Sequence, residues 1–131
     1  MQQANLYQQY KAQSLETLTR GEVVVKLLEA ASKQISTAIF LTSGDDDRNS
    51  VKAFNCTVKA QKIIQTLDLS LDMQYDISKD LRDMYLFIHE KLGQAITKKD
   101  VKLMKDLLSL VDDLKVTFRQ AEKLARVSGW R

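Results

Sequence analysis

The sequence predicts an all-α protein, an antiparallel up-down four-helix bundle with a short N-terminal arm. The 131 residues include no proline and only four glycines, whereas a sheet protein of this size needs many turns, and turns depend on these residue types. The apolar residues recur at helical spacing, and the polar segments between these stretches are short. With 44% hydrophobic residues, the chain can bury one core but is too short for two ordinary domains.

The first helix is expected from about residue 19 to Leu41. Thr19 and Glu22 have the spacing of a capping box, with Thr19 as the N-cap. Residues 1–18 are expected to form a loose arm before this helix, and residues 42–48 a loop after it. The apolar residues that share one face of the helix are Val24, Leu27, Leu28, Ala31, Ile35, Ala38 and Ile39.

The second helix is expected from about Asn49 to Ser70, and the third from Ser78, as its N-cap, to about Ile96. Each has one main apolar stripe that would face the core. The stripe of the second helix comprises Ala53, Cys56, Ala60, Ile63, Ile64, Leu67 and Leu71. The stripe of the third comprises Leu81, Met84, Tyr85, Ile88, Leu92, Ala95 and Ile96.

The fourth helix is expected to follow a tight loop, with Asp100 as its N-cap, and to end near Arg126. Because the loops are short, successive helices should run antiparallel. Its apolar residues include Leu103, Met104, Leu107, Leu108, Leu110, Val111, Leu114, Phe118 and Ala121. The predicted division of the chain is an N-terminal arm at 1–18, a bundle at 19–126 and a C-terminal tail at 127–131.

The second helix carries more apolar surface than a bundle core requires. A core-facing helix needs an apolar arc of somewhat over about 100°. Val51, Phe54 and Val58 form a separate stripe, about 120° or more from the centre of the main one. Such a stripe can form a groove that receives the amphipathic helix of a partner. The same stripe could instead be internal in an irregular bundle or pack a homodimer, and the sequence leaves these three alternatives open.

Other residues extend this candidate partner-binding surface. Leu108 lies at one edge of the broad apolar face of the fourth helix, while Lys59 and Gln61 would supply polar contacts at the edge of the groove. Tyr7 and Tyr10 are spaced i, i+3 in the arm, which could cover the groove until a partner displaces it. The arm could equally be a packed or frayed terminal extension. On the third helix, Leu86 and Phe87 also lie off the main face.

We expect a binding protein and no enzyme, with no catalytic, metal or cofactor site. Cys56 lies within an apolar stripe, where a cysteine usually acts as a small hydrophobe. His89 precedes Glu90, but no motif places a nucleophile beside them. One cysteine and one histidine are too few for a multi-cysteine or poly-histidine metal site. The four glycines are isolated and form no phosphate-binding loop.

The charge pattern is compatible with a cytoplasmic protein and leaves one alternative function. The net charge is +3, and no window approaches about 18 consecutive apolar residues, so we expect neither a membrane span nor a secretory signal. The densest basic segment is the C-terminal end, with Lys115, Arg119, Lys123, Arg126 and Arg131. Cations there oppose the helix dipole, an ordinary structural role, so no nucleic acid is expected as a partner. A regulatory or nucleic-acid-binding protein that uses this end is the alternative.

Several stretches of the chain resemble the flagellar export chaperone family FliS. They are residues 7–10, 19–22, 59–72, 84–88 and 114–121, in the family's order and without a large gap. The chain departs from the family pattern at three positions. Arg20 stands where the family usually has proline, Leu28 replaces a common tyrosine, and Phe118 replaces a common tryptophan.

The resemblance implies a small cytoplasmic helical chaperone. Such a protein binds the C-terminal region of flagellin, prevents its premature polymerisation and delivers it to the flagellar type III export apparatus. The client segment would be disordered when free and would fold along the chaperone. A component of the export gate and a second copy of the chain are the other partners to consider.

Overall fold

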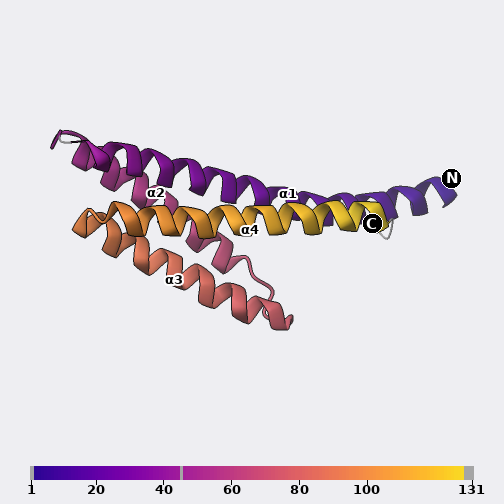
Figure 1. Cartoon of the computed structure of the whole chain (residues 1–131). Helices are drawn as coiled ribbons and strands as arrows, with labels where there is room; N and C mark the ends of the chain where they lie inside the picture. The colour runs from indigo at the N-terminus through magenta and orange to yellow at the C-terminus, as the bar shows by residue number, and fades with distance from the viewer. Residues whose placement is uncertain (1, 45, 129–131) are drawn as a thin grey trace.

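The computed structural model describes the backbone of residues 2–44 and 46–128, and the side chains of residues 21–44 and 46–123. Four helices make up the fold, and the described residues include no strand. Each helix packs against the next, and the last packs against the first, so the bundle closes (Figure 1). The predicted all-α fold class is confirmed. The helices are α1 (Gln2–Ser43), α2 (Asn49–Leu69), α3 (Asp76–Lys98) and α4 (Val101–Ser128).

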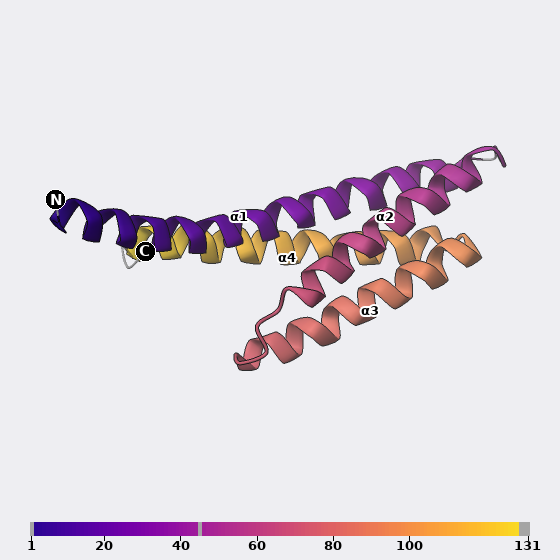
Figure 2. The same cartoon turned by 180° about the vertical axis from the view of Figure 1, so that it is seen from behind.

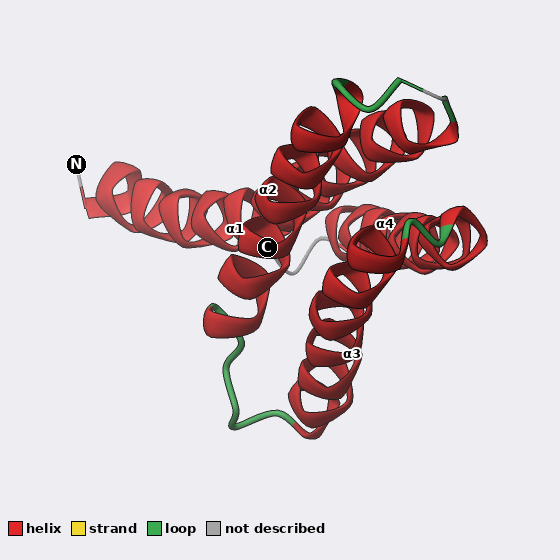
Figure 3. Cartoon of the chain, turned by 90° about the vertical axis from the view of Figure 1, so that its left-hand side faces the viewer, coloured by secondary structure: helices red, strands yellow, loops and turns green. Residues whose placement is uncertain are grey.

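The bundle contains four helices at one end and two at the other. α1 and α4 form a long antiparallel pair, and the shorter α2–α3 hairpin lies beside only part of it (Figures 1 and 2). Figure 3 looks at the four-helix end, where the α1–α2 loop and the α3–α4 turn lie close together. The connector between α2 and α3 therefore projects beside the middle of the long pair.

α1 begins at Gln2, so the predicted helix start at Thr19 and the loose arm before it are wrong. Residues 2–20 contain no proline or glycine, and nothing in them ends a helix. Gly21 lies inside α1, where the missing side chain lets α4 come close: a Cβ there would lie 3.3 Å from Cγ of Glu122. The first turns of α1 extend beyond the end of α4 (Figure 1).

The core consists of the apolar stripes that face the bundle axis. The stripes predicted for α1 and α2 are confirmed, because every member is buried or half-buried. Tyr85 is the largest fully buried side chain among residues 21–44 and 46–123. Met84, predicted for the α3 stripe, is instead 37% exposed, since it lies at the edge of that face. The core residues include Leu28, Ile35, Ile64, Leu67, Ile88, Leu92, Met104, Leu107 and Val111.

Of the N-caps predicted for the last two helices, one is confirmed and one is wrong. Asp100 is confirmed as the N-cap of α4, because its Oδ1 accepts a hydrogen bond from the backbone N–H of Leu103 at 3.0 Å. The prediction of Ser78 as the N-cap of α3 is wrong, because that helix already begins at Asp76. The Ser78 hydroxyl instead donates to the carbonyl oxygen of Asp72 at 2.6 Å and ties the α2–α3 connector to α3.

Candidate partner-binding surface

The second apolar stripe of α2 lies on the surface of the molecule. Val51 is 67% exposed, Phe54 is 52% exposed, and Val58 is half-buried. Helical spacing of i, i+3 and i+7 brings the three side chains to one face of α2. Of the three alternatives that the sequence leaves open, an internal position is therefore excluded for Val51 and Phe54. A contiguous apolar patch of this kind is typical of an interaction site.

This stripe borders the seam between α2 and α3. Two polar contacts hold the helices together there. Nε2 of Gln61 donates to the carbonyl oxygen of His89 at 2.9 Å, and Nε of Arg82 lies 3.1 Å from Oδ1 of Asp68. Gly93 makes room for the Gln61 side chain, since a Cβ at this glycine would lie 3.1 Å from Nε2 of Gln61. The two contacts fix which face of α3 lies against α2.

The same face of α3 carries an exposed leucine. Leu86 lies four residues after Arg82 and three before His89, so it shares their face of the helix. It is 52% exposed. We name the surface formed by Val51, Phe54, Val58 and Leu86 the α2–α3 seam. The sequence showed that Leu86 lies off the main face, but only the observed pairing of the helices assigns it to this surface.

The two polar residues predicted at the groove edge lie on opposite sides of the stripe. They are two positions apart, which is about 200° around a helix. Gln61 lies on the side of α3, and its amide nitrogen is already engaged by His89. Lys59 is exposed on the other side. The ammonium group of Lys59 therefore stays accessible to a bound chain, whereas the amide nitrogen of Gln61 does not.

Leu108 is half-buried and packs against the core. The other residues at the two edges of the broad α4 face, among them Val101, Leu103 and Leu110, are also half-buried. The surplus apolar width of this helix is therefore internal, because α4 has a neighbour on each side. Leu108 is consequently less accessible to a partner than Val51 or Phe54.

The side chains of Tyr7 and Tyr10 lie outside the described residues. Their backbone belongs to α1, which runs from the two-helix end toward the loop that leads into α2 (Figure 1). At 1.5 Å per residue, Tyr10 lies roughly 50 Å along α1 from Ser43, the end of the helix near Val51. The expectation that this segment borders the Val51 stripe is therefore wrong for this conformation, because the segment continues α1 as a helix.

A buried tyrosine lies beneath the seam. Tyr85 is 1% exposed. Burial, with a smaller contribution from the nearby Asp68 carboxylate, raises the pKa of Tyr85 to about 12. The phenol therefore stays neutral at any physiological pH and adds no charge to the ion pair of Asp68 and Arg82.

The basic C-terminal end is partly neutralised by ion pairs. Nζ of Lys115 lies 3.4 Å from Oδ1 of Asp112, which also accepts a hydrogen bond from the hydroxyl of Ser32 at 2.8 Å. Arg119 pairs with Glu29 of α1. The Ser32–Asp112 and Glu29–Arg119 contacts join α1 to α4, and the two ion pairs give the cations a structural role. The side chains of Arg126 and Arg131 lie outside the described residues.

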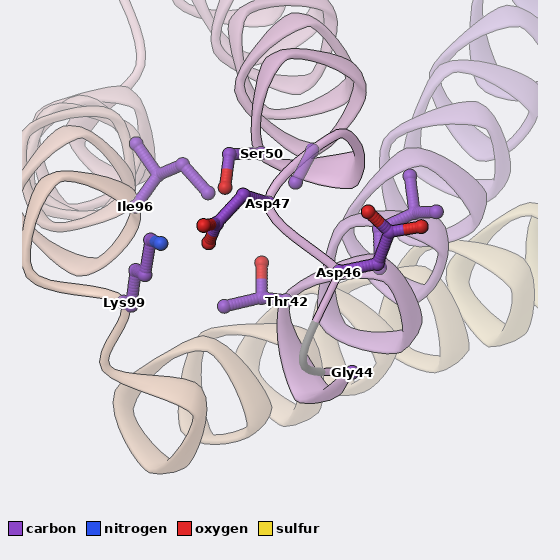
Figure 4. Close-up of a pocket in the computed structure, with 9 residues that line it drawn as sticks. Thr42, Gly44, Asp46, Asp47, Ser50, Ile96 and Lys99 are labelled. Carbon is purple, nitrogen blue, oxygen red and sulfur yellow. The ribbon is translucent and has the colours of Figure 1, made fainter.

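A pocket of about 310 Å³ opens at the four-helix end, between the α1–α2 loop and the α3–α4 turn. Figure 4 shows the Asp47 carboxylate and the Thr42 hydroxyl in this pocket, with Lys99 on its far side. Asp46 also lines the pocket, and its carboxylate accepts hydrogen bonds from the side chain and the backbone N–H of Arg48. These bonds hold the pKa of Asp46 below its ordinary value. The pocket is small and polar and does not include the seam.

No group of three or more metal-ligating side chains occurs in the described part of the chain. Cys56 is a half-buried free thiol that packs against the core. The carbonyl oxygen of His89 accepts the hydrogen bond from Gln61, which gives this residue a structural contact. Within the same residues, no helix is long and apolar enough to cross a membrane.

Some exposed apolar residues were not expected from the sequence. Phe40 is 79% exposed near the end of α1, and Ile77 is 65% exposed in the first turn of α3. Phe40 comes one residue after Ile39, the last member of the predicted core stripe, and is not part of that stripe. This position could have identified it as outward-facing. Ile77 precedes the predicted N-cap, Ser78, which lies three residues after the observed N-cap, Tyr75.

The chain is similar in sequence to known flagellar proteins. The model of a protein family described as "Flagellar protein FliS" matches residues 3–125. The chain is also similar to a protein of Bacillus subtilis (strain 168) named "Flagellar secretion chaperone FliS". The two are 29% identical over 117 residues, which cover 89% of this chain and 86% of that protein.

Proposed function

Since the chain belongs to the FliS family of flagellar proteins, we propose that it is a flagellar secretion chaperone. Its client is the C-terminal region of flagellin, which it keeps unpolymerised in the cytoplasm and delivers to the flagellar type III export apparatus. The client binds on the α2–α3 seam as an amphipathic helix. The protein acts by binding alone and uses no catalytic step and no cofactor.

The exposure of the seam is the observation that supports this proposal most directly. Val51, Phe54 and Leu86 are each more than half exposed, although large apolar side chains are stabilised by burial. Full burial of such a side chain is worth about 1.5–3 kcal/mol. A client that folds on binding must first offset the free energy of its own ordering, about 2–5 kcal/mol or more. Several anchors along one surface are therefore needed, and the seam offers them.

The polar contacts beneath the seam make it ready to bind. The Gln61–His89 hydrogen bond and the Asp68–Arg82 ion pair hold α2 and α3 in register. A surface that is already ordered loses little entropy when a partner docks on it. The ordering cost of the complex therefore lies mostly with the client chain. Lys59 is positioned to contact polar groups of the client at the outer edge.

The nucleic-acid-binding alternative has less support. Lys115 and Arg119, two of the cations on which it depends, already pair with Asp112 and Glu29. A phosphate backbone would have to compete with these pairs. The nucleic-acid-binding alternative predicts binding to DNA or RNA that weakens steeply with added salt. The absence of any such binding at low ionic strength would exclude this alternative.

Titration calorimetry with a peptide from the C-terminal region of flagellin tests the proposal. We expect saturable binding that Phe54→Ser weakens by at least about tenfold, because this change removes an exposed anchor. The thermal stability of the variant should stay close to that of the parent protein. Val116→Ser is the matched control, since Val116 is 48% exposed on α4, outside the seam.

A second substitution separates binding from folding. Val58→Asp should weaken binding of the same peptide more than it weakens the fold, because Val58 is only half-buried. A folded parent protein that releases no saturable heat with the peptide would exclude the proposed client. If Val58→Asp unfolds the bundle while Phe54→Ser binds normally, the stripe is structural and the client site lies elsewhere.

A further inference from the structure

α3 carries a second row of exposed apolar side chains, apart from the α2–α3 seam. Ile77 is 65% exposed, Met84 37% and Phe87 46%. Their spacing of i, i+7 and i+10 corresponds to positions a, a and d of a heptad, so they form one line along the helix. By helical geometry this line lies roughly 150° around α3 from Leu86. It therefore belongs to a different face from the seam.

A row of acidic residues accompanies this line. Asp76, Asp83 and Glu90 follow one another at seven-residue intervals and occupy position g of the same heptad. Asp80 occupies position d, so it lies on the apolar line itself, between Ile77 and Met84. Acidic residues three or four positions apart on a helix repel one another and destabilise it by a few tenths of a kcal/mol. Lys79, three residues after Asp76 and four before Asp83, offsets part of this repulsion.

Few contacts within the molecule engage the carboxylates of this acidic row. In the part of the chain that the structure describes, no hydrogen bond or ion pair engages the carboxylates of Asp76 and Asp83. Oε1 of Glu90 accepts one long bond, 3.4 Å, from Nε2 of Gln94. The positive end of the helix dipole explains an acidic residue in the first turn, at Asp76. The dipole does not explain those further along, because its effect fades within a turn.

Nearby cations leave the row accessible. Nζ of Lys91 lies 5.8 Å from the centre of the Phe87 ring, at the far end of the apolar line. Lys79, in the first half of α3, lies within 4 Å of no carboxylate in the described residues. Arg82 is held by Asp68 on the other face. The first half of this face is thus both apolar and negative.

We propose that this face of α3, formed by Ile77, Met84 and Phe87 with Asp76, Asp83 and Glu90, docks an amphipathic helix of a second partner protein. The partner helix carries apolar residues at positions a and d and Lys or Arg at seven-residue intervals along one edge. Charged residues at the edges of such helix pairs select the partner and its orientation. The apolar line lies on a different side of α3 from Leu86, whereas Asp83 and Glu90, three residues before and four after Leu86, lie between the two.

Charge also decides against a second copy of this chain as the occupant. In a symmetric dimer through this face, the same patch would lie on both sides of the interface. The acidic rows of the two copies would then come close together, and like charges across an interface are unfavourable. A basic helix of another protein has no such penalty.

The test uses two designed four-heptad helical peptides with leucine at positions a and d. One has lysine along its edge and the other glutamate. We expect the lysine peptide to bind the full chain saturably, with an affinity that falls as salt is added, and the glutamate peptide not to bind. The triple variant Asp76→Asn, Asp83→Asn, Glu90→Gln should bind the lysine peptide about tenfold more weakly, since it loses three charge pairs.

Variants on the two faces of α3 separate this site from the client site. Phe87→Ser should weaken binding of the lysine peptide and leave binding of the flagellin peptide unchanged. Leu86→Ser should weaken binding of the flagellin peptide and leave binding of the lysine peptide unchanged. Both residues are about half exposed, so neither change should unfold the bundle. Failure of flagellin peptide to bind would reject the proposed function without affecting this result.

Three outcomes would overturn the inference. The first is that the lysine peptide does not bind, and the second is that the glutamate peptide binds equally well. The third is that flagellin peptide displaces the lysine peptide, which would make the face part of the client site. A concentration-dependent dimer that the Phe87→Ser variant cannot form would identify a second copy of the chain as the occupant and would also reject the proposal.

Discussion

Lys99 allows the chain to reverse direction between α3 and α4 in two residues. Its φ of 52° and ψ of 41° are left-handed, and it is the non-glycine residue with positive φ in the described part of the chain. The turn is closed by a 2.8 Å hydrogen bond from the backbone N–H of Asp100 to the carbonyl oxygen of Ala95. Residues other than glycine pay a steric penalty in this conformation.

Replacing Lys99 by glycine should therefore stabilise the protein. We expect Lys99→Gly to raise the free energy of unfolding by about 0.5–1 kcal/mol, because glycine adopts the left-handed conformation without the clash of a Cβ atom. Urea denaturation of parent and variant measures the difference. Lys98→Gly, one residue earlier and inside α3, should instead destabilise by about as much. A loss of stability at Lys99→Gly would contradict the prediction.

Tyr85 should make the fold sensitive to alkaline pH. Its pKa is raised from 10.0 to about 12 in the folded protein, so folding favours the neutral phenol. The stability associated with this shift is fully present below pH 10 and is lost as the pH rises through about 12. We expect Tyr85→Phe to remove this part of the alkaline decline.

Denaturant unfolding at a series of pH values measures that effect. Tyr75→Phe is the control, because Tyr75 is 63% exposed and its replacement should leave the pH dependence as in the parent. If the Tyr85→Phe and parent proteins lose stability equally between pH 10 and 12, the folded environment does not favour the neutral phenol.

At the scale of the elements, the start of α4 depends on the Asp100 side chain, and the end of α3 on the left-handed backbone of Lys99. The middle of α1 instead packs against α4 at Gly21. α1 has no break at Gly21, since packing against Glu122 of α4 uses the missing side chain. Glycine inside a helix costs about 1 kcal/mol relative to alanine, a cost that packing between helices can offset. The capping-box spacing at Thr19 therefore lies inside a continuous helix.

The N-cap of α4 offers a test at this scale. We expect Asp100→Ala to lower the free energy of unfolding by about 1 kcal/mol, because the backbone N–H of Leu103 loses its partner. Thermal unfolding of the variant measures the loss. Asp106→Ala, on an exposed position of the same helix, should change stability by less than about 0.5 kcal/mol. Equal losses in the two variants would argue against a capping role.

At the scale of the whole molecule, a short hairpin beside a long helix pair leaves two faces of α3 uncovered. One of these faces carries Leu86 and belongs to the α2–α3 seam, and the other carries Ile77, Met84 and Phe87. α3 has helices on two sides only, and a bundle of four helices has no further element to cover it. Exposed apolar surface on this scale is the property expected of a protein that works by holding another chain.

Binding of the client should therefore stabilise the fold as a whole. At a free flagellin-peptide concentration one hundred times its Kd, we expect the free energy of unfolding to rise by about 2.7 kcal/mol, because the peptide binds only the folded bundle. Thermal unfolding with and without peptide measures the change, and a scrambled peptide is the control. An unchanged unfolding midpoint at that concentration would be incompatible with binding to the folded seam.

Most of the fold could be predicted from the sequence. Periodic spacing identified the core faces of α1 and α2, and Asp100 was recognised as a cap, because both signals lie within a few residues of chain. The same local reasoning failed at Thr19, where the spacing of a capping box predicted a helix start inside a helix that begins at Gln2. It also failed at Ser78, whose hydroxyl binds the connector and does not begin the helix.

The separate stripe of Val51, Phe54 and Val58 was already evident in the sequence, whereas its exposure was decided by the tertiary structure. Spacing along one helix shows which side chains share a face, since that depends only on helix geometry. Which helix covers that face depends on how segments far apart in the chain pack, and no local pattern records it. The pairing of Gln61 with His89, and with it the place of Leu86, could be known only once α2 and α3 had been assembled.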